Sequence, residues 1–218
     1  MKTLFNDAMA DLPLVAILRG ITPGEAEPIG EVLAQSGFRF IEVPLTSPDA
    51  FVSIALLVDL LGSNIIVGAG TVRRVSDLDR LVDAGGRLMV TPQADTALIR
   101  AAVERKLITL PGVATPTEAF AALDAGADGL KLFPSEMLPP SVVKAFRTVV
   151  GPDVRLCSTG GIEPSDLARY LAAGASGFGL GGALYRPGNT ATDVEANARA
   201  FVSSWLAAAP SMKSADGK

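Results

Sequence analysis

Short apolar runs and amphipathic runs alternate along the whole chain, and this alternation constrains the fold most. Eight segments with strand character are each followed by one with helical character. Their spacing, roughly 20–27 residues, is typical of a (β/α)8 barrel. The predicted strands are Leu14–Leu18, Phe38–Val43, Asn64–Gly68, Arg87–Thr91, Leu107–Leu110, Asp128–Phe133, Val154–Ser158 and Gly177–Leu180.

The segments between these strands have helical periodicity, and four of them end at a glycine, which supplies the left-handed residue that often ends a helix. These ends are Ser36-Gly37, Ala84-Gly85, Ala125-Gly126 and Ala173-Gly174. An open doubly wound sheet is the alternative, but eight regular units in 218 residues favour closure. With a further helix over Thr3–Ala10, the sequence predicts a single TIM barrel, α/β in class, with an extra N-terminal helix. We expect residues 1–209 to form this one domain and 210–218 to be a disordered tail.

Composition excludes several classes of function. The net charge is −4 without a basic stripe, so we expect no nucleic-acid partner. No apolar run is long enough to span a bilayer, and the N-terminus lacks a signal-peptide core. The single cysteine, Cys157, fits a reducing cytoplasm and is expected to be a small core residue. The chain has no histidine, which excludes Ser-His-Asp chemistry and argues against a zinc site, so we predict no metal and no cofactor.

One lysine, Lys131, interrupts the apolar run Gly129-Leu130-Lys131-Leu132-Phe133-Pro134. Alternate residues of a barrel strand point inward, so Arg19, Glu42 and Lys131 can all face the interior near the carboxyl ends of their strands. That end carries the active site in this fold. A desolvated amine is the nucleophile that forms a Schiff base with a carbonyl, and a nearby carboxylate can move the protons.

Each of these residues also has a purely structural interpretation. A strand-end lysine can extend its charge to water, and a buried Arg–Glu pair alone is weak evidence of function. Three inward charges on three strands are costly, however, and we therefore favour function.

Glycine-rich segments follow the third, seventh and eighth predicted strands. Thr159-Gly160-Gly161-Ile162 and Gly179-Leu180-Gly181-Gly182-Ala183 occupy the two positions that bind phosphate in many barrels. Gly68-Ala69-Gly70-Thr71 is a weaker signal, because it is also compatible with a tight turn in which Thr71 caps a helix. Pro92 ends the fourth predicted strand at the same mouth.

Seven motifs, in this order, resemble the class I 2-keto-3-deoxy-6-phosphosugar (KDPG/KHG) aldolases. They are Ala16-Ile17-Leu18-Arg19-Gly20, Ile41-Glu42-Val43-Pro44-Leu45, Gly68-Ala69-Gly70-Thr71, Val90-Thr91-Pro92, Leu110-Pro111-Gly112, Leu130-Lys131-Leu132-Phe133-Pro134 and Thr159-Gly160-Gly161. The run Ile17–Pro23, Thr46 where gluconate-specific relatives tend to carry Arg, and Leu184-Tyr185-Arg186-Pro187-Gly188 are similar to the galactonate branch.

The resemblance implies a metal-free homotrimeric barrel that cleaves 2-dehydro-3-deoxy-6-phosphogalactonate to pyruvate and glyceraldehyde 3-phosphate in galactonate degradation. It implies that Lys131 forms the imine and Glu42 is the general acid/base. It assigns substrate binding to Arg19, Thr71, Pro92, Phe133, Thr159, Gly160, Gly161, Gly181 and Gly182. Gly182 departs from the family, which often has Ser there, so one hydroxyl contact to phosphate is lost.

Other functions remain open. The C4-epimeric phosphogluconate, or 4-hydroxy-2-oxoglutarate, could be the substrate of the same chemistry. A phosphosugar isomerase or epimerase would share the phosphate loops but need no imine-forming lysine, and a phosphosugar-binding barrel would bind without turnover.

Overall fold

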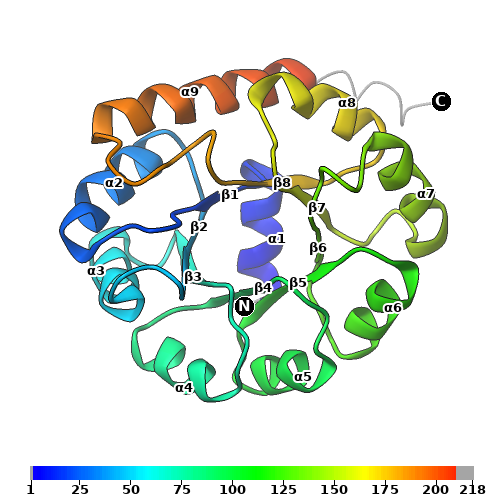
Figure 1. Cartoon of the computed structure of the whole chain (residues 1–218), viewed down its shortest axis with the longest axis horizontal. Helices are drawn as coiled ribbons and strands as arrows, with labels where there is room; N and C mark the ends of the chain where they lie inside the picture. The colour runs from blue at the N-terminus through cyan, green and yellow to red at the C-terminus, as the bar shows by residue number, and fades with distance from the viewer. Residues whose placement is uncertain (1, 210–218) are drawn as a thin grey trace.

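The computed structural model describes residues 2–209 and contains a closed ring of eight parallel strands, β1 to β8 in chain order, surrounded by helices (Figure 1). Each strand pairs with the next, and β8 pairs with β1. The strands are β1 Leu14–Ile17, β2 Phe40–Pro44, β3 Ile66–Gly70, β4 Leu88–Thr91, β5 Ile108–Val113, β6 Leu130–Leu132, β7 Leu156–Thr159 and β8 Gly177–Leu180. The predicted TIM barrel is confirmed.

The outer helices follow their strands in the predicted order. They are α2 Pro23–Gln35, α3 Ala50–Leu61, α4 Ser76–Asp83, α5 Thr96–Glu104, α6 Pro116–Asp124, α7 Pro140–Val150, α8 Leu167–Ala172, preceded by a 3-10 turn at Pro164–Asp166, and α9 Ala191–Ala208. No helix among residues 2–209 is long and apolar enough to cross a membrane. The predicted tail 210–218 lies outside the described residues.

Alternation along the strands divides the apolar residues into two clusters. One, between barrel and helices, includes Leu18, Ile41 and Leu132. The other, inside the barrel, includes Val15, Phe40 and Cys157. Residues two apart on a strand point to the same face. Ile17 and Glu42 therefore point inward like Val15 and Phe40, and Lys131 points inward beside its partner Cys157, all near the carboxyl ends of their strands.

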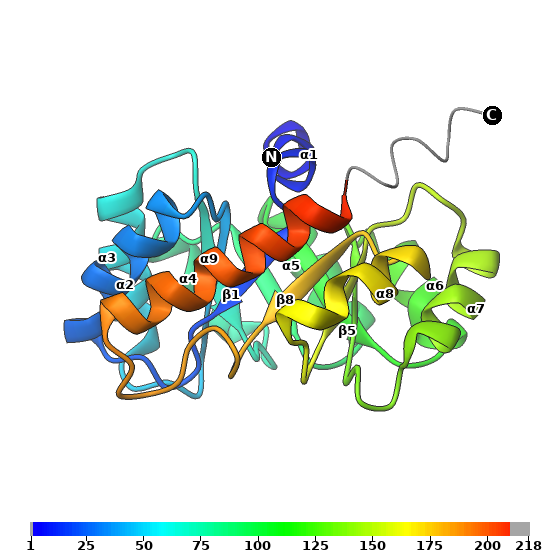
Figure 2. The ribbon, with the colours of Figure 1, turned by 90° about the horizontal axis from the view of Figure 1, so that it is seen from above.

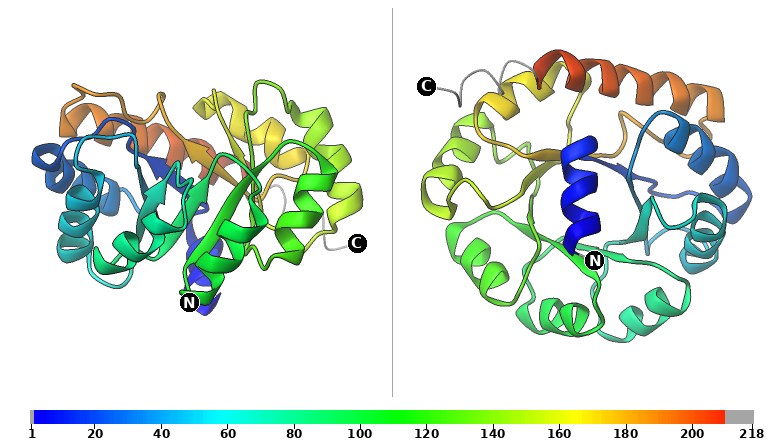
Figure 3. Two further views of the ribbon diagram at one scale, coloured as in Figure 1. Left: turned by 60° about the horizontal axis from the view of Figure 1, so that its bottom comes forward. Right: turned by 180° about the vertical axis from the view of Figure 1, so that it is seen from behind.

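The extra N-terminal helix, α1 Lys2–Asp11, closes the amino end of the barrel. Figures 2 and 3 show it lying across that opening, apart from the ring of outer helices. Phe5, Ala8 and Met9 join the interior cluster, and Phe5 packs edge-on against Phe40 with ring centres 5.9 Å apart. With the amino end filled by apolar side chains, the charged inward residues lie at the opposite end.

Six of the predicted strands begin one or two residues too early, and the third and fifth also end two and three residues too soon. The third strand begins at Ile66 rather than Asn64 and runs through Gly70, so the glycine segment lies within the strand and does not follow it. Exposed Asn64 lies in a turn, whereas Gly70 pairs with Pro44 of β2. The fifth strand continues past Leu110 to Val113, and its Gly112 pairs with Lys131. Glycine and proline lower strand propensity, but tertiary pairing overrides this preference.

Candidate active site

Lys131 and Glu42 face each other inside the carboxyl end of the barrel. Lys131 Nζ lies 3.8 Å from Glu42 Oε1, and the side chains are 10% and 1% exposed, respectively. Both line a small internal cavity with Val90, Leu110 and Cys157. The separation exceeds a hydrogen bond of about 2.7–3.2 Å, so a proton would pass between them through an intervening water or hydroxyl.

The surroundings of Glu42 favour its protonated form more than water does. Burial raises the pKa of Glu42 above its usual value, and the positive charges of Lys131 and Arg19 oppose this rise in part. Glu42 Oε2 is buried and has no hydrogen-bond partner among residues 2–209. An unsatisfied buried oxygen is costly in a structural role, and it is available to a substrate hydroxyl.

The glycines of β3 allow this close packing. A Cβ at Gly70 would lie 2.4 Å from Glu42 Oε2, and one at Gly68 would lie 2.0 Å from the backbone oxygen of Leu88. Neither residue has a left-handed backbone, so glycine is required at both positions because a side chain would not fit. Gly70 therefore makes room for the carboxylate from β2, and Gly68 makes room for the backbone of β4.

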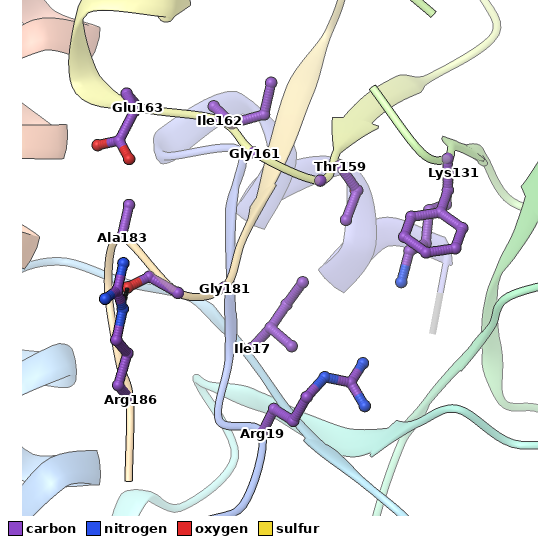
Figure 4. A pocket seen from close by; sticks show the side chains of 13 residues that line it. Ile17, Arg19, Lys131, Thr159, Gly161, Ile162, Glu163, Gly181, Ala183 and Arg186 are labelled. Carbon is purple, nitrogen blue, oxygen red and sulfur yellow. Dashed lines mark hydrogen bonds between the residues drawn. The ribbon is translucent and has the colours of Figure 1, made fainter. Parts of the chain in front are cut away.

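A larger cavity opens above this pair and extends across the mouth. Figure 4 shows the head groups of Arg19 and Lys131 directed into it from one side, with Arg186 and Glu163 on the other. Arg19 Nη1 donates to Thr46 Oγ1 at 3.1 Å, and the Lys131 ammonium lies 5.1 Å from the centre of the Phe133 ring. One end of the cavity therefore carries the amine.

The far end is formed by the segments after β7 and β8, including Gly161, Gly181 and Gly182. Within the described chain, the backbone N–H groups of Gly161, Gly182 and Ala183 donate no hydrogen bond. Gly161 has a φ of 58°, which glycine adopts readily. Free N–H groups facing a cavity are suited to bind phosphate.

The predicted site residues divide into two groups. The structure brings Arg19, Lys131, Phe133, Thr159, Gly160, Gly161, Gly181 and Gly182 together around the large cavity, with Glu42 directly below. Thr71 and Pro92 do not line it: Thr71, with a φ of 54°, faces a neighbouring hollow with Arg73 and Arg74. Thr71 is also five residues before α4 begins at Ser76, so it does not cap that helix.

Five further residues line the cavity: Ile17, Ile162, Glu163, Ala183 and Arg186. Ile162 and Ala183 belong to the two predicted phosphate-binding segments, whereas Ile17, Glu163 and Arg186 were not predicted to bind substrate. Arg186 had a usable signal, because it is a cation four residues after the last predicted phosphate-loop glycine. Cys157 lies in the interior cluster, where burial raises the pKa of its thiol to about 12. A thiol that stays protonated is a poor nucleophile, consistent with a packing role.

We predict that Gly70→Ala impairs the site far more than Gly24→Ala. The added methyl would overlap the buried Glu42 carboxylate, whereas a Cβ at Gly24 meets nothing within 4 Å. A displacement of about 1 Å at a catalytic group can cost about 100-fold in rate. Turnover by the two purified variants, with their thermal unfolding, checks this. Wild-type turnover in Gly70→Ala would show that Glu42 does not need this packing.

Comparison with known proteins places this geometry in a family. The family model described as KDPG and KHG aldolase matches residues 5–198. A probable 2-dehydro-3-deoxy-6-phosphogalactonate aldolase of Rhizobium meliloti is 46% identical over 88% of this chain and 91% of its own. The 2-dehydro-3-deoxy-6-phosphogalactonate aldolase of Escherichia coli is 43% identical over 89% and 95%. A solved structure described as native KDPGal superposes with a TM-score of 0.90 at 42% identity, covering 91% of this chain and 97% of the other. The chain therefore belongs to the KDPG and KHG aldolase family.

Proposed function

We propose that the protein is a class I aldolase that cleaves 2-dehydro-3-deoxy-6-phosphogalactonate to pyruvate and D-glyceraldehyde 3-phosphate. The observation that carries this proposal is the buried pair, with Lys131 Nζ 3.8 Å from Glu42 Oε1 beneath a cavity that ends in free backbone N–H groups. The two relatives at 46% and 43% identity that are named for this activity support the substrate.

Catalysis begins with Lys131 as nucleophile. Its neutral amine attacks the C2 carbonyl, and the resulting carbinolamine loses water to give a protonated imine, with Glu42 transferring the protons. Glu42 then accepts the C4 hydroxyl proton. As the C4 carbonyl forms, the C3–C4 bond breaks, and its electron pair moves to C3–C2 and the imine nitrogen. Protonation of the enamine at C3 and hydrolysis release pyruvate and the free lysine.

The remaining cavity residues bind the substrate. Arg19 lies where it can contact the carboxylate or a hydroxyl, and Thr159 and Phe133 contact the chain of carbons. Gly161, Gly181 and Gly182 bind the phosphate through backbone N–H groups, and Gly160 contacts the substrate beside them. On the resemblance alone, we also assign the pyruvyl carboxylate to Thr71 and a substrate contact to Pro92. Binding the phosphate far from the breaking bond orients the reacting carbons.

Supplying the two C4-epimeric 2-dehydro-3-deoxy-6-phospho acids separately tests this function. We expect pyruvate release mainly from the galactonate epimer, and borohydride added with pyruvate should inactivate the enzyme by reducing an imine on Lys131. Peptide mass spectrometry locates the adduct. Lys131→Met should show neither turnover nor adduct.

The same experiment separates the alternatives. Preference for the gluconate epimer would change the substrate but keep the mechanism. Full activity without an adduct, or activity retained in Lys131→Met, would eliminate the imine and favour an isomerase. Binding without turnover would indicate a phosphosugar-binding protein.

The raised pKa of Glu42 predicts the pH dependence. Glu42 must be ionised to accept the C4 hydroxyl proton, and burial raises its pKa above 4.5. As the pH falls through this raised value, the carboxylate is protonated and kcat/KM falls. We expect an acid limb above pH 4.5 that is missing in Glu42→Gln, whose rate should be about 100- to 10,000-fold lower. If the fall in kcat/KM at acid pH persists in Glu42→Gln, a group other than Glu42 causes it.

We also propose a cytoplasmic homotrimer, as the resemblance implies. Val52 and Leu60 on α3 and Val75 and Val82 at α4 are large apolar side chains exposed in the single chain, which suits an interface between copies. Sedimentation equilibrium should give three times 22.4 kDa. A monomer mass at micromolar concentration would contradict this assembly.

A further inference from the structure

Arg186 lies at the phosphate end of the cavity without an assigned role. It lines the cavity with Gly161 and Gly182, opposite Lys131 and Arg19 (Figure 4). Glu163 also lines this end, but no carboxylate among residues 2–209 forms an ion pair with Arg186. The guanidinium therefore adds an uncompensated positive charge where a dianionic group would bind.

The position of Arg186 is fixed at three points. Its backbone N–H donates to Asn189 Oδ1 at 2.7 Å, and its carbonyl accepts from the N–H of Asn189 at 3.0 Å. Its side-chain Nε donates to the carbonyl of Gly182 at 2.7 Å. The preceding residue, Tyr185, is 2% exposed and anchors the turn in the core. The two terminal nitrogens make no hydrogen bond within the described chain, and a pre-organised donor loses little entropy on binding.

Position 182 lies directly beside the guanidinium of Arg186. A Cβ at Gly182 would have Arg186 Nε as its nearest contact, at 3.6 Å, and Arg186 Nη2 at 4.0 Å. A side chain at position 182 would therefore be in van der Waals contact with the guanidinium, and both positions line the same cavity. A group at position 182 and the guanidinium can thus reach the same bound anion.

We propose that Arg186 binds the phosphate of the substrate and supplies the charged contact that a hydroxyl at position 182 would otherwise make. This inference rests on the proposed function for the identity of the substrate, but its anion is any phosphate monoester. A guanidinium donates two parallel hydrogen bonds to phosphate oxygens, which are stronger than the bond from one serine hydroxyl. Arg186 is thus a specificity residue that distinguishes phosphorylated from unphosphorylated acids.

The test compares Arg186→Ala, Arg186→Lys and, as a matched control, Arg199→Ala, whose side chain is 73% exposed on α9. Two acids are supplied, 2-dehydro-3-deoxy-6-phosphogalactonate and the same acid without phosphate. For Arg186→Ala we expect kcat/KM to fall about 10- to 100-fold on the phosphorylated acid, mainly through KM, and to stay unchanged on the other. Arg186→Lys keeps the positive charge but cannot donate two parallel hydrogen bonds, so its kcat/KM on the phosphorylated acid should lie between those of the wild type and Arg186→Ala.

A second set of variants tests whether a hydroxyl at position 182 can partly replace the phosphate contact of Arg186. The double variant Gly182→Ser/Arg186→Ala should have a kcat/KM about two- to tenfold higher than that of Arg186→Ala, because a neutral hydroxyl replaces part of the contact to phosphate. In the wild-type background Gly182→Ser should have little effect or a small harmful one. Additive effects of the two substitutions would show that they do not share one ligand.

Calorimetry with inorganic phosphate makes the inference independent of turnover. We expect weaker phosphate binding by Arg186→Ala than by the wild type and by Arg199→Ala. If the wild type cleaves neither acid, the proposed function fails, and the phosphate titration still decides the role of Arg186. Absence of phosphate binding in the wild type, equal binding in Arg186→Ala, or equal loss of activity on both acids would overturn the inference.

Discussion

Burial of one carboxylate beside one amine inside a closed ring of strands is the constraint on which the site depends. Glu42 and Lys131 lie on β2 and β6, which are not neighbours in the sheet, so only closure of the barrel brings them to 3.8 Å. Exclusion of water destabilises the ionised carboxylate of Glu42, and the positive charge of Lys131 offsets this only in part. In an open sheet the same residues would be separated and solvated, and neither would have unusual reactivity.

Two clusters of apolar residues create this environment. The outward cluster attaches the helices to the barrel, and the inward cluster, with Phe5 and Met9 of α1, fills the amino end. Charged inward side chains are therefore confined to the carboxyl end. The chemical groups can be close together there because β3 contributes Gly70 beside Glu42, where any Cβ would displace the carboxylate.

The two ends of the mouth present different chemical groups. At one end are the amine and carboxylate, which suit a carbonyl and a hydroxyl. At the other are backbone N–H groups with Arg186, which suit a phosphate. This separation explains how binding energy from a remote group can orient the reacting carbons. In the role proposed for Arg186, the guanidinium fixed beside Gly182 supplies a contact to phosphate that a glycine side chain cannot make.

The sequence by itself determined the barrel, the extra helix and the inward direction of Arg19, Glu42 and Lys131, because period-two alternation and regular spacing are local properties. It did not determine that Gly70 packs on Glu42 or that β3 and β5 extend through glycine and proline, because those depend on neighbouring strands. Nor could it predict that Thr71 faces a different hollow, or that Arg186 folds back over Gly182. The hollow that Thr71 faces includes Leu45 and Phe51, which are distant in the chain. The contacts of Arg186 depend on the backbone path of the loop after β8, which no sequence period describes.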